Sequence, residues 1–225
     1  MVRKTVMLNT PPPSPSNSII LVPVAKYAEP ETQQSISSLG YPVEYLYGVS
    51  DISVARNRLS TTAILKGAEW LFWIDSDMLF SFADFQELVT RDSMFLATPY
   101  MQKTMGGSLC VLEDGPRRAC GFGFVKSHRS LYRGEACSQS PNGPFLFANF
   151  YPGIHAMSWG NAFYGEDYSF CLRSHIPVEI AYEIEIGHIG RHAYRYRYDG
   201  GLPVRSAIKQ IGKEGSLLPD ERRNM

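Results

Sequence analysis

Residues 69–80 read Glu-Trp-Leu-Phe-Trp-Ile-Asp-Ser-Asp-Met-Leu-Phe, and this stretch decides the fold. The part from Trp70 to Ile74 is an unbroken apolar run, too short for a helix and without the alternation of a half-exposed strand. A strand buried on both faces has this pattern, and such strands are typical of parallel sheets. The polar residues that follow it therefore lie at the carboxyl end of a strand, where open α/β sheets bind their ligands.

Asp75 and Asp77 stand two residues apart just after that run. In an extended chain this spacing points both carboxylates the same way, and two anions in a half-buried cleft are costly unless a cation neutralises them. Carboxylate oxygens suit Mg²⁺ or Mn²⁺, which in turn hold substrate phosphates. The pair predicts a divalent metal site, and capping of the next helix is the alternative reading of the same residues.

Segments on both sides of this run alternate between strand and helix patterns. We expect further strands over 18–24, 43–47, 94–98, 121–125 and 177–186, and helices over 31–39, 53–66, 82–90 and 165–173. The alternation up to residue 98 predicts an α/β fold with a mostly parallel central sheet flanked by helices.

Composition limits the class of protein. The 225 residues are 44% hydrophobic and 20% charged, which is ordinary for a folded domain of this length. The formal net charge of zero excludes a global attraction to nucleic acid or to a membrane surface, although a local patch remains compatible with it. The four cysteines lack Cys-x-x-Cys spacing, which predicts free thiols in a reducing compartment. No segment has the length of a signal peptide or membrane span, so we expect a soluble, cytoplasmic protein.

The two ends of the chain differ from its centre. Residues 1–17 contain a proline- and serine-rich segment and are expected to form an extended leader. Residues 134–144 are small and polar, which predicts a mobile loop. From His188 onward the chain has eight Arg or Lys against four acids, with tyrosines interleaved among them. This basic tail over 191–225 is suited to binding phosphates or stacking on bases, and a polar edge strand with a solvated tail is the alternative.

Polar residues outside the central stretch add further candidates. Arg56 stands in the first turn of an expected helix, where a cation opposes the helix dipole, so an anionic ligand or an acidic neighbour explains it better than helix stability does. A solvated surface arginine is the alternative. His188 follows a glycine at the end of an expected strand, and we expect it to be free to swing toward a cleft. For Glu166 and Asp167, capping of the helix that they begin is a sufficient explanation.

Taken in order, the motifs are more specific than any one of them. They are Ala55-Arg56-Asn57, Asp75-Ser76-Asp77, Pro99-Tyr100 with Lys103, Gly121-Phe122-Gly123-Phe124, Gly165-Glu166-Asp167 with Phe170-Cys171 and Arg173, and Gly187-His188. This ordered set resembles the GT-A-fold glycosyltransferases, in particular the small family-2-like enzymes of bacteria and bacteriophages. The resemblance implies one GT-A, Rossmann-like domain over 18–190, with a nucleotide-sugar-binding half over 18–98 and an acceptor and catalytic half over 99–190.

The resemblance also implies a role for each matching residue on the donor side. Asp77, helped by Asp75, and His188 would hold Mn²⁺ or Mg²⁺ on the diphosphate of a nucleotide-sugar, with a UDP-sugar expected. The remaining donor-binding residues would be Pro23, Val24, Asp51, Arg56, Asn57, Ser76 and Lys103.

On the acceptor side, Asp167 matches the general base of inverting members, and Glu166 is the alternative. In a retaining enzyme both would instead hold acceptor hydroxyls, and the resemblance favours inversion. Phage enzymes of this kind glycosylate hydroxymethylated bases in DNA, which is one acceptor class; a saccharide or lipid-linked acceptor for surface polysaccharide is the rival. A noncatalytic nucleotide-sugar-binding module is the hypothesis from a different class, because only residues 99–164 are available for the acceptor.

Overall fold

A mixed six-stranded sheet forms the centre of the molecule, in the strand order β13-β5-β8-β3-β1-β2. The structure is a computed structural model that describes residues 10–103, 108–132 and 149–190, together with the backbone of 136–137, 146–147, 193–195 and 209–211. The strands of the sheet are β1 (Ser18–Val24), β2 (Val43–Tyr47), β3 (Trp70–Ile74), β5 (Phe95–Ala97), β8 (Phe124–His128) and β13 (Glu179–Ile180). β1 pairs in parallel with β2 and β3, and β5 with β13, whereas β8 runs antiparallel to both β3 and β5.

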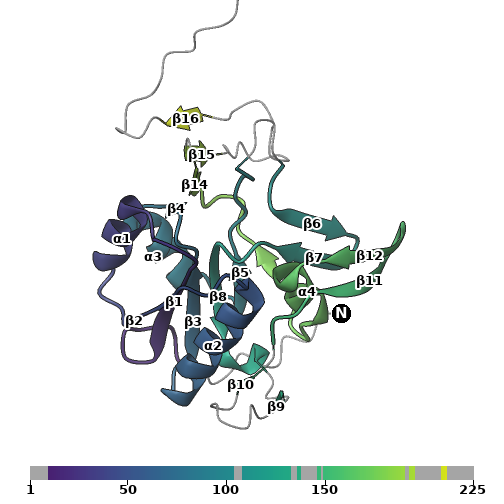
Figure 1. The fold of residues 1–225 in the computed structure, drawn as a ribbon, viewed down its shortest axis with the longest axis horizontal. Helices are drawn as coiled ribbons and strands as arrows, with labels where there is room; N and C mark the ends of the chain where they lie inside the picture. Colours follow the sequence, from purple (N-terminus) through teal and green to yellow (C-terminus); the bar gives the residue numbers. More distant parts are fainter. Residues whose placement is uncertain are drawn as a thin grey trace, which may run out of the picture.

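Helices cover both faces of this sheet (Figure 1). They are α1 (Pro30–Ser37), α2 (Ile52–Leu65), α3 (Phe82–Thr90) and α4 (Glu166–Arg173). The part of the chain that the structure describes is therefore an α/β fold with a six-stranded mixed sheet and four α-helices, which confirms the predicted fold class at this level.

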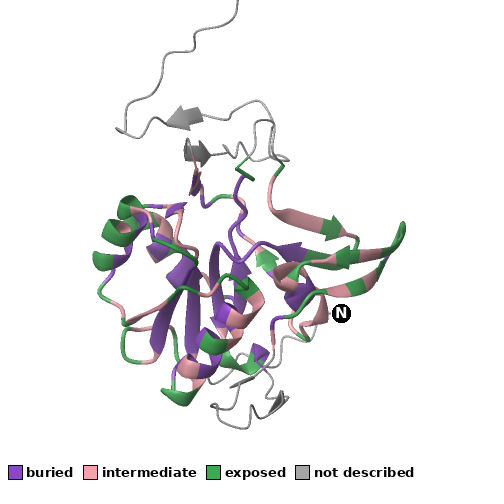
Figure 2. Ribbon diagram, in the orientation of Figure 1, coloured by how far each residue is buried: buried purple, intermediate pink, exposed green. Residues whose placement is uncertain are grey.

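The apolar run of β3 is explained by two separate cores. Phe72 and Ile74 pack in one core with side chains of α1 and α3, while Leu71 and Trp73 pack in the other with side chains of α2 and α4. All five residues of β3 are buried, as the purple centre of Figure 2 shows. Because successive side chains of a strand point to opposite faces, a strand between two cores must be apolar at every position.

Smaller sheets surround the central one. A second sheet has the order β16-β15-β14-β4, and three antiparallel pairs lie beyond it. These elements are β4 (Met78–Leu79), β14 (Gly187–Ile189), β15 (Ala193–Arg195) and β16 (Lys209–Ile211); β6 (Val111–Asp114) with β7 (Arg117–Cys120); β9 (Ala136–Cys137) with β10 (Leu146–Phe147); β11 (Gly153–Met157) with β12 (Gly160–Tyr164); and a 3-10 turn, η1 (Arg129–Leu131).

Two predicted strands are wrong in extent. The strand expected over 121–125 begins only at Phe124, because the backbone of Gly121 and Gly123 lies against the ring of Tyr100 instead of in the sheet. The strand expected over 177–186 is reduced to β13, because its partner β5 ends at Ala97 and offers no further backbone groups. The other predicted strands and the predicted helices are found within about two residues of their expected bounds, which is the usual uncertainty of helix ends.

Several sequence expectations lie wholly or partly outside the described residues. They are the start of the leader, most of the 134–144 loop, and the basic tail apart from β15 and β16. Cys110, Cys120 and Cys171 are free, as predicted for those three. Within the described ranges, every helix is too short or too polar to cross a membrane.

The contact between Gly123 and Tyr100 makes a testable prediction. A Cβ atom at Gly123 would lie 2.6 Å from Tyr100 Cε1 and 3.0 Å from Met78 Sδ, which is closer than packed atoms tolerate. We expect Gly123→Ala to lower the free energy of unfolding by about 1–3 kcal/mol, the usual cost of overpacking a core. Urea unfolding measures this change.

The matched control is Gly153→Ala, because a Cβ atom there meets only ordinary contacts, the nearest at 3.4 Å. Its free energy of unfolding should change by no more than about 0.5 kcal/mol. Equal effects of the two substitutions would contradict the close packing of Tyr100 against Gly123.

Candidate functional site

A pocket of about 210 Å³ opens at the carboxyl ends of β1 and β3. It lies where open α/β sheets usually bind ligands. Its lining includes five of the predicted donor-site residues and the predicted imidazole. The lining residues are Pro23, Val24, Ala25, Val49, Ser50, Ile52, Asp75, Ser76, Asp77, Tyr100 and His188.

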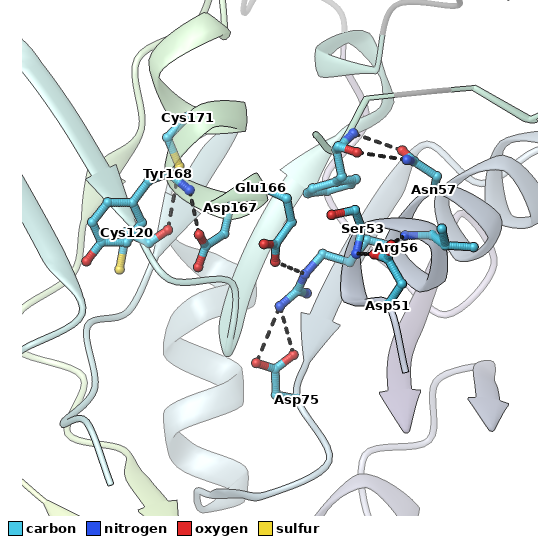
Figure 3. A network of polar contacts seen from close by, with 12 residues as sticks. Asp51, Ser53, Arg56, Asn57, Asp75, Cys120, Glu166, Asp167, Tyr168 and Cys171 are labelled. Carbon is cyan, nitrogen blue, oxygen red and sulfur yellow. Dashed lines mark hydrogen bonds and ion pairs between the residues drawn. The ribbon is translucent and has the colours of Figure 1, made fainter. Parts of the chain in front are cut away.

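Arg56 is buried behind this pocket and joins two acids from distant parts of the chain. Its Nη2 lies 3.1 Å from Asp75 Oδ1, and its Nε lies 3.4 Å from Glu166 Oε1. Figure 3 shows the guanidinium between these two carboxylates, with Asp167 beside Glu166 on the first turn of α4. The alternative of a solvated arginine is therefore wrong, and an acidic neighbour explains the position of Arg56 in α2, as the sequence indicated.

The surroundings of Arg56 are aromatic as well as acidic. Its guanidinium lies 5.5 Å from the ring centres of both Trp73 and Phe122, within the range of cation–π attraction. Its Nη1 is buried without a hydrogen-bond partner among the described residues. A buried donor without a partner is costly, so an acceptor within reach of this nitrogen would be bound favourably.

Asp75 and Asp77 do not point to one common position. Residues 75–77 form a turn, in which Met78 N donates to Asp75 O at 3.3 Å, so the chain is not extended there. Burial raises the pKa of Asp75, and Arg56 offsets this rise only in part. Asp77 instead faces Lys103 and His188. Burial alone would raise the pKa of Asp77, but its hydrogen bonds with His188 and Lys103 outweigh that effect and lower it.

A backbone ladder places His188 beside Asp77. β14 pairs antiparallel with β4 so that His188 lies opposite Met78, and Ile189 N donates to Asp77 O at 2.7 Å. The imidazole is held rather than free to swing, because its ring packs edge-on against Tyr100 with ring centres 5.0 Å apart. The expectation of a mobile histidine between glycines is therefore wrong.

The hydrogen bonds of His188 determine which ring nitrogen can take a ligand. Nδ1 lies 2.9 Å from the carbonyl oxygen of Met101, which only accepts hydrogen bonds, so Nδ1 carries a proton. Nε2 faces Asp77 Oδ1 at 3.4 Å. Nε2 thus either shares a second proton with Asp77 or presents its lone pair to a cation held by both residues, as in metal sites whose histidine donates its other nitrogen to a carbonyl.

The donor set of this pair fits a divalent ion that completes its shell from a substrate. One carboxylate and one imidazole suit Mn²⁺, and Mg²⁺ sites commonly use one or two carboxylates with phosphate and water. Among the described residues, no group of three or more His, Cys, Asp or Glu converges on one point. Asp77 and His188 would therefore supply only part of the shell of a metal ion, whereas Asp75 is engaged by Arg56.

Asp167 is the second acid of the α4 first turn and has a different environment from Glu166. Its carboxylate accepts a hydrogen bond from Tyr168 N at 2.7 Å and is only partly exposed. Burial, together with the neighbouring charge of Glu166, raises the pKa of Asp167 to about 6. A carboxyl group with such a pKa exchanges protons readily near neutral pH, as a general base must.

Two predicted donor-site residues have structural contacts instead of pocket contacts. The Asp51 carboxylate caps α2 by accepting hydrogen bonds from Ser53 N at 2.9 Å and Val54 N at 3.2 Å. Asn57 binds the backbone of Asn149 and Phe150 through both ends of its amide. Neither residue lines the pocket, whereas Val49, Ser50 and Ile52, which lie next to Asp51 in the chain, do.

Tyr100 belongs to the ordered motifs of the sequence, but no role in the site was predicted for it. It lines the pocket, supports His188, and is buried, which raises its pKa well above the usual value. Its place directly after Pro99 at the end of an expected strand was a usable signal, because strand ends on this edge carry the site. The two glycines that accommodate its ring are far from it in sequence, so their contact was not visible.

Comparisons with known proteins define the fold and leave the family open. No protein-family model matches the chain, and no curated protein matches its sequence. The crystal structure of A197 from STIV is similar, with a TM-score of 0.55 and 16% identity, over 80% of this chain and 90% of that chain. At this identity the likeness shows the fold alone. A glycosyltransferase involved in the glycosylation of the major capsid of PBCV-1 has a TM-score of 0.32 and 15% identity, over 50% of this chain and 60% of that chain, which is too weak to carry an argument.

The raised pKa of Asp167 makes stability depend on pH. A carboxyl group whose pKa is higher in the folded state, here about 6, than in the unfolded chain, about 4, binds its proton more tightly when folded. Stability is therefore lost as pH rises between these two values, by about 2–3 kcal/mol. We expect Asp167→Asn to remove this loss, measured as the difference between variant and wild-type unfolding free energies across the pH range.

Asp92→Asn serves as the control, because Asp92 is exposed at the surface. This variant should retain the wild-type dependence of stability on pH. The same dependence in wild type and Asp167→Asn would show that Asp167 is not the group concerned.

Proposed function

We propose that this protein is a GT-A-type glycosyltransferase that moves a sugar from a nucleoside-diphosphate sugar to an acceptor hydroxyl. The observation that carries the proposal is the pair of ion pairs that Arg56 makes (Figure 3). One partner, Asp75, lines the pocket together with Asp77 and His188, and the other, Glu166, is followed in α4 by Asp167, whose pKa is raised. The ordered motifs of the sequence support the same reading, and a UDP-sugar is the expected donor.

The pocket offers different chemistry to the two ends of such a donor. Pro23, Val24 and Val49 give an apolar surface suited to a nucleoside, with polar groups from Ser50 nearby. The diphosphate would lie toward Asp77 and His188, where Mn²⁺ or Mg²⁺ neutralises its charge when bound. Lys103, which contacts Asp77, is exposed enough to turn toward phosphate oxygens.

The acids of α4 supply the remaining chemistry. In the proposed inverting reaction, Asp167 takes the proton of the acceptor hydroxyl. At the same time the oxygen of that hydroxyl forms a bond to the anomeric carbon of the sugar. The bond from that carbon to the diphosphate oxygen breaks, and its electron pair leaves with the diphosphate. Arg56 stabilises this charge distribution by fixing Glu166 and Asp75, and its unpartnered Nη1 adds a positive group close to the site.

The acceptor belongs to one of two classes. A hydroxymethylated base in DNA would rely on the basic tail, most of which lies outside the described residues. A saccharide or lipid-linked acceptor needs only a hydroxyl brought to Asp167. Both remain proposals for the same reaction.

Donor binding can be tested by thermal unfolding in the presence of nucleoside diphosphates and their sugars, with and without Mn²⁺. A ligand that binds only the native state raises the midpoint, so the true donor should stabilise the protein most when Mn²⁺ is present. Asp77→Asn should remove the metal-dependent part of this shift. Asp92→Asn, which changes a residue that does not line the pocket, should keep it.

Turnover tests the chemistry separately. Release of nucleoside diphosphate should fall about 10²–10⁴-fold in Asp167→Asn while donor binding persists, as expected for loss of a general base. Wild-type turnover should also fall below a pH of about 6, where Asp167 is protonated. Donor binding without even slow donor hydrolysis would instead identify a noncatalytic binding module, and absence of binding to every nucleoside diphosphate would contradict the proposal.

Lys103 gives a prediction about metal binding that does not depend on activity. Its ammonium contacts the same carboxylate that would bind the ion, so the two cations compete for Asp77. We expect Lys103→Gln to raise Mn²⁺ affinity about fivefold in the absence of nucleotide, which corresponds to an exposed ion pair of roughly 1 kcal/mol. The fraction of free Mn²⁺ can be followed by electron paramagnetic resonance.

Lys66→Gln is the matched control, because it also breaks one exposed ion pair, with Glu44, away from the pocket. Its Mn²⁺ affinity should equal that of the wild type. Unchanged or weaker Mn²⁺ binding by Lys103→Gln would refute the competition.

A further inference from the structure

A second pocket, of about 250 Å³, lies between the proline-rich segment before β1 and the carboxyl end of α3. None of its residues lines the pocket of the proposed reaction. An apolar protein cavity of about 150 Å³ binds benzene, so this second pocket has room for a small molecule built on one ring. The lining residues are Thr10, Pro12, Pro13, Trp70, Val89, Thr90, Arg91, Asp92, Ser93 and Lys126.

Lys126 places a charged side chain in the core beside this pocket. It lies on β8 opposite Phe72 of β3 and Leu96 of β5, and only 1% of its surface is exposed. A lysine is almost never fully buried unless it is paired. Among the described residues, however, Lys126 forms no salt bridge. A residue that breaks the pattern of the core in this way is expected at a functional site.

The end of α3 orients the Lys126 amine. Nζ donates to Val89 O at 3.3 Å and to Arg91 O, and it lies 5.6 Å from the ring centre of Trp70. A neutral amine has two N–H groups and one lone pair. When both N–H groups serve these two carbonyls, the lone pair is directed away from the helix end and is left for a ligand in the pocket. Capping of α3 explains the two hydrogen bonds but not the cavity beside the amine.

The surroundings also make the neutral amine accessible near neutral pH. Burial lowers the pKa of Lys126 to about 8; Arg91 lowers it further, and the carboxylates of Asp92 and Glu179 oppose this shift. At pH 7.5 about a quarter of an amine with this pKa is neutral, against about one in a thousand for an ordinary lysine. Lysines desolvated in apolar pockets are the ones that form Schiff bases with carbonyl compounds.

We propose that Lys126 captures a small neutral aldehyde in this pocket as a Schiff base. The side chains of Pro12, Pro13, Trp70 and Val89 give the pocket apolar walls suited to a flat, apolar body. The amine beside these walls supplies the group that fixes the carbonyl carbon. This inference does not rest on the proposed function, because it uses other residues and needs neither a sugar donor nor a metal ion.

The charges around the pocket favour a neutral ligand over an anion. The carboxyl end of α3 borders the pocket, and the dipole of a helix repels anions at that end. Asp92, which is exposed, adds a carboxylate to the lining. The guanidinium of Arg91 does not offset these groups, because it is paired with Glu87 and Glu183.

The reaction conserves charge and ends on a cation that the helix end stabilises. The Lys126 ammonium first releases one proton. The Nζ lone pair then forms a bond to the carbonyl carbon, and a second proton moves from nitrogen to the carbonyl oxygen. The carbon–oxygen bond breaks, and the oxygen leaves as water with both protons. The iminium that remains keeps one N–H for Arg91 O, so only the longer hydrogen bond, to Val89 O, is given up.

Reductive trapping of the full chain tests the proposal directly. Benzaldehyde with sodium cyanoborohydride converts an iminium into a stable benzylamine, which mass spectrometry of peptides locates. At pH 7.5 we expect Lys126 to be modified at least about tenfold faster than Lys26 and Lys66, which are both exposed. The rate at Lys126 should level off with rising benzaldehyde concentration because the pocket fills, whereas the rates at the exposed lysines should rise in proportion.

Two comparisons separate the pocket from the amine. With 4-carboxybenzaldehyde, which adds a carboxylate to the same ring, modification of Lys126 relative to Lys26 should fall about fivefold. Thr90→Trp narrows the pocket at an exposed lining residue and should slow capture at Lys126 by a similar factor.

Ser37→Trp is the matched control for Thr90→Trp. Each residue is exposed, is the last of its helix, and donates its hydroxyl to the carbonyl four residues earlier. Ser37 does not line the pocket, so Ser37→Trp should capture benzaldehyde as the wild type does. Urea unfolding shows whether each variant is folded, and the levelling off in the wild type tests the pocket independently of both variants.

Three results would overturn the proposal. Modification of Lys126 no faster than that of Lys26 and Lys66 would leave the amine as a cap of α3 alone. A rate at Lys126 that rises in proportion to benzaldehyde would identify a reactive lysine without a ligand pocket. Faster capture of 4-carboxybenzaldehyde than of benzaldehyde would assign the pocket to an anion. Because each readout is an adduct on Lys126, failure of this proposal is distinguishable from failure of the proposed reaction.

Discussion

One buried guanidinium holds the candidate site together. Arg56 comes from α2, Asp75 from the end of β3 and Glu166 from the start of α4, so its two ion pairs join the early and late parts of the chain. A buried charge is tolerated only when it is paired, and removing one partner typically costs about 3–5 kcal/mol because the remaining charges stay uncompensated. The relative positions of the pocket and the acids of α4 thus depend on this one side chain, which aromatic rings enclose on its other side.

The pair of Asp77 and His188, which we propose binds the metal ion, has a different origin, because it is brought together by backbone pairing. The ladder between β4 and β14 brings His188 to Asp77, and the carbonyl of Met101 assigns the proton to Nδ1. The ring of Tyr100 packs edge-on against the imidazole and is itself accommodated by two glycines. A histidine held on three sides presents Nε2 in one direction, which is what ordered metal ligation requires.

The ion pairs of Arg56 and the β4–β14 ladder place the four acids of the site in different environments. The charges of Asp75 and Glu166 are neutralised by Arg56 within the protein. Asp77 instead pairs with Lys103, whose partly exposed side chain can move away, and burial raises the pKa of Asp167. Titratable groups whose environments move their pKa values apart are typical of sites that use one of them as an acid or a base.

By itself the sequence determined the central strand, because a strand between two cores has to be apolar at each position, and Trp70 to Ile74 meets that condition. It also indicated that Arg56 meets an anionic ligand or an acidic neighbour, since a cation in the first turn of a helix is otherwise unfavourable, and the structure shows the acidic neighbours. Only the tertiary structure decided that Asp75 and Asp77 face different partners, that His188 is held in a strand, and where β8 begins. These features depend on turns, strand pairing and close packing between residues far apart in the chain, which local spacing does not encode.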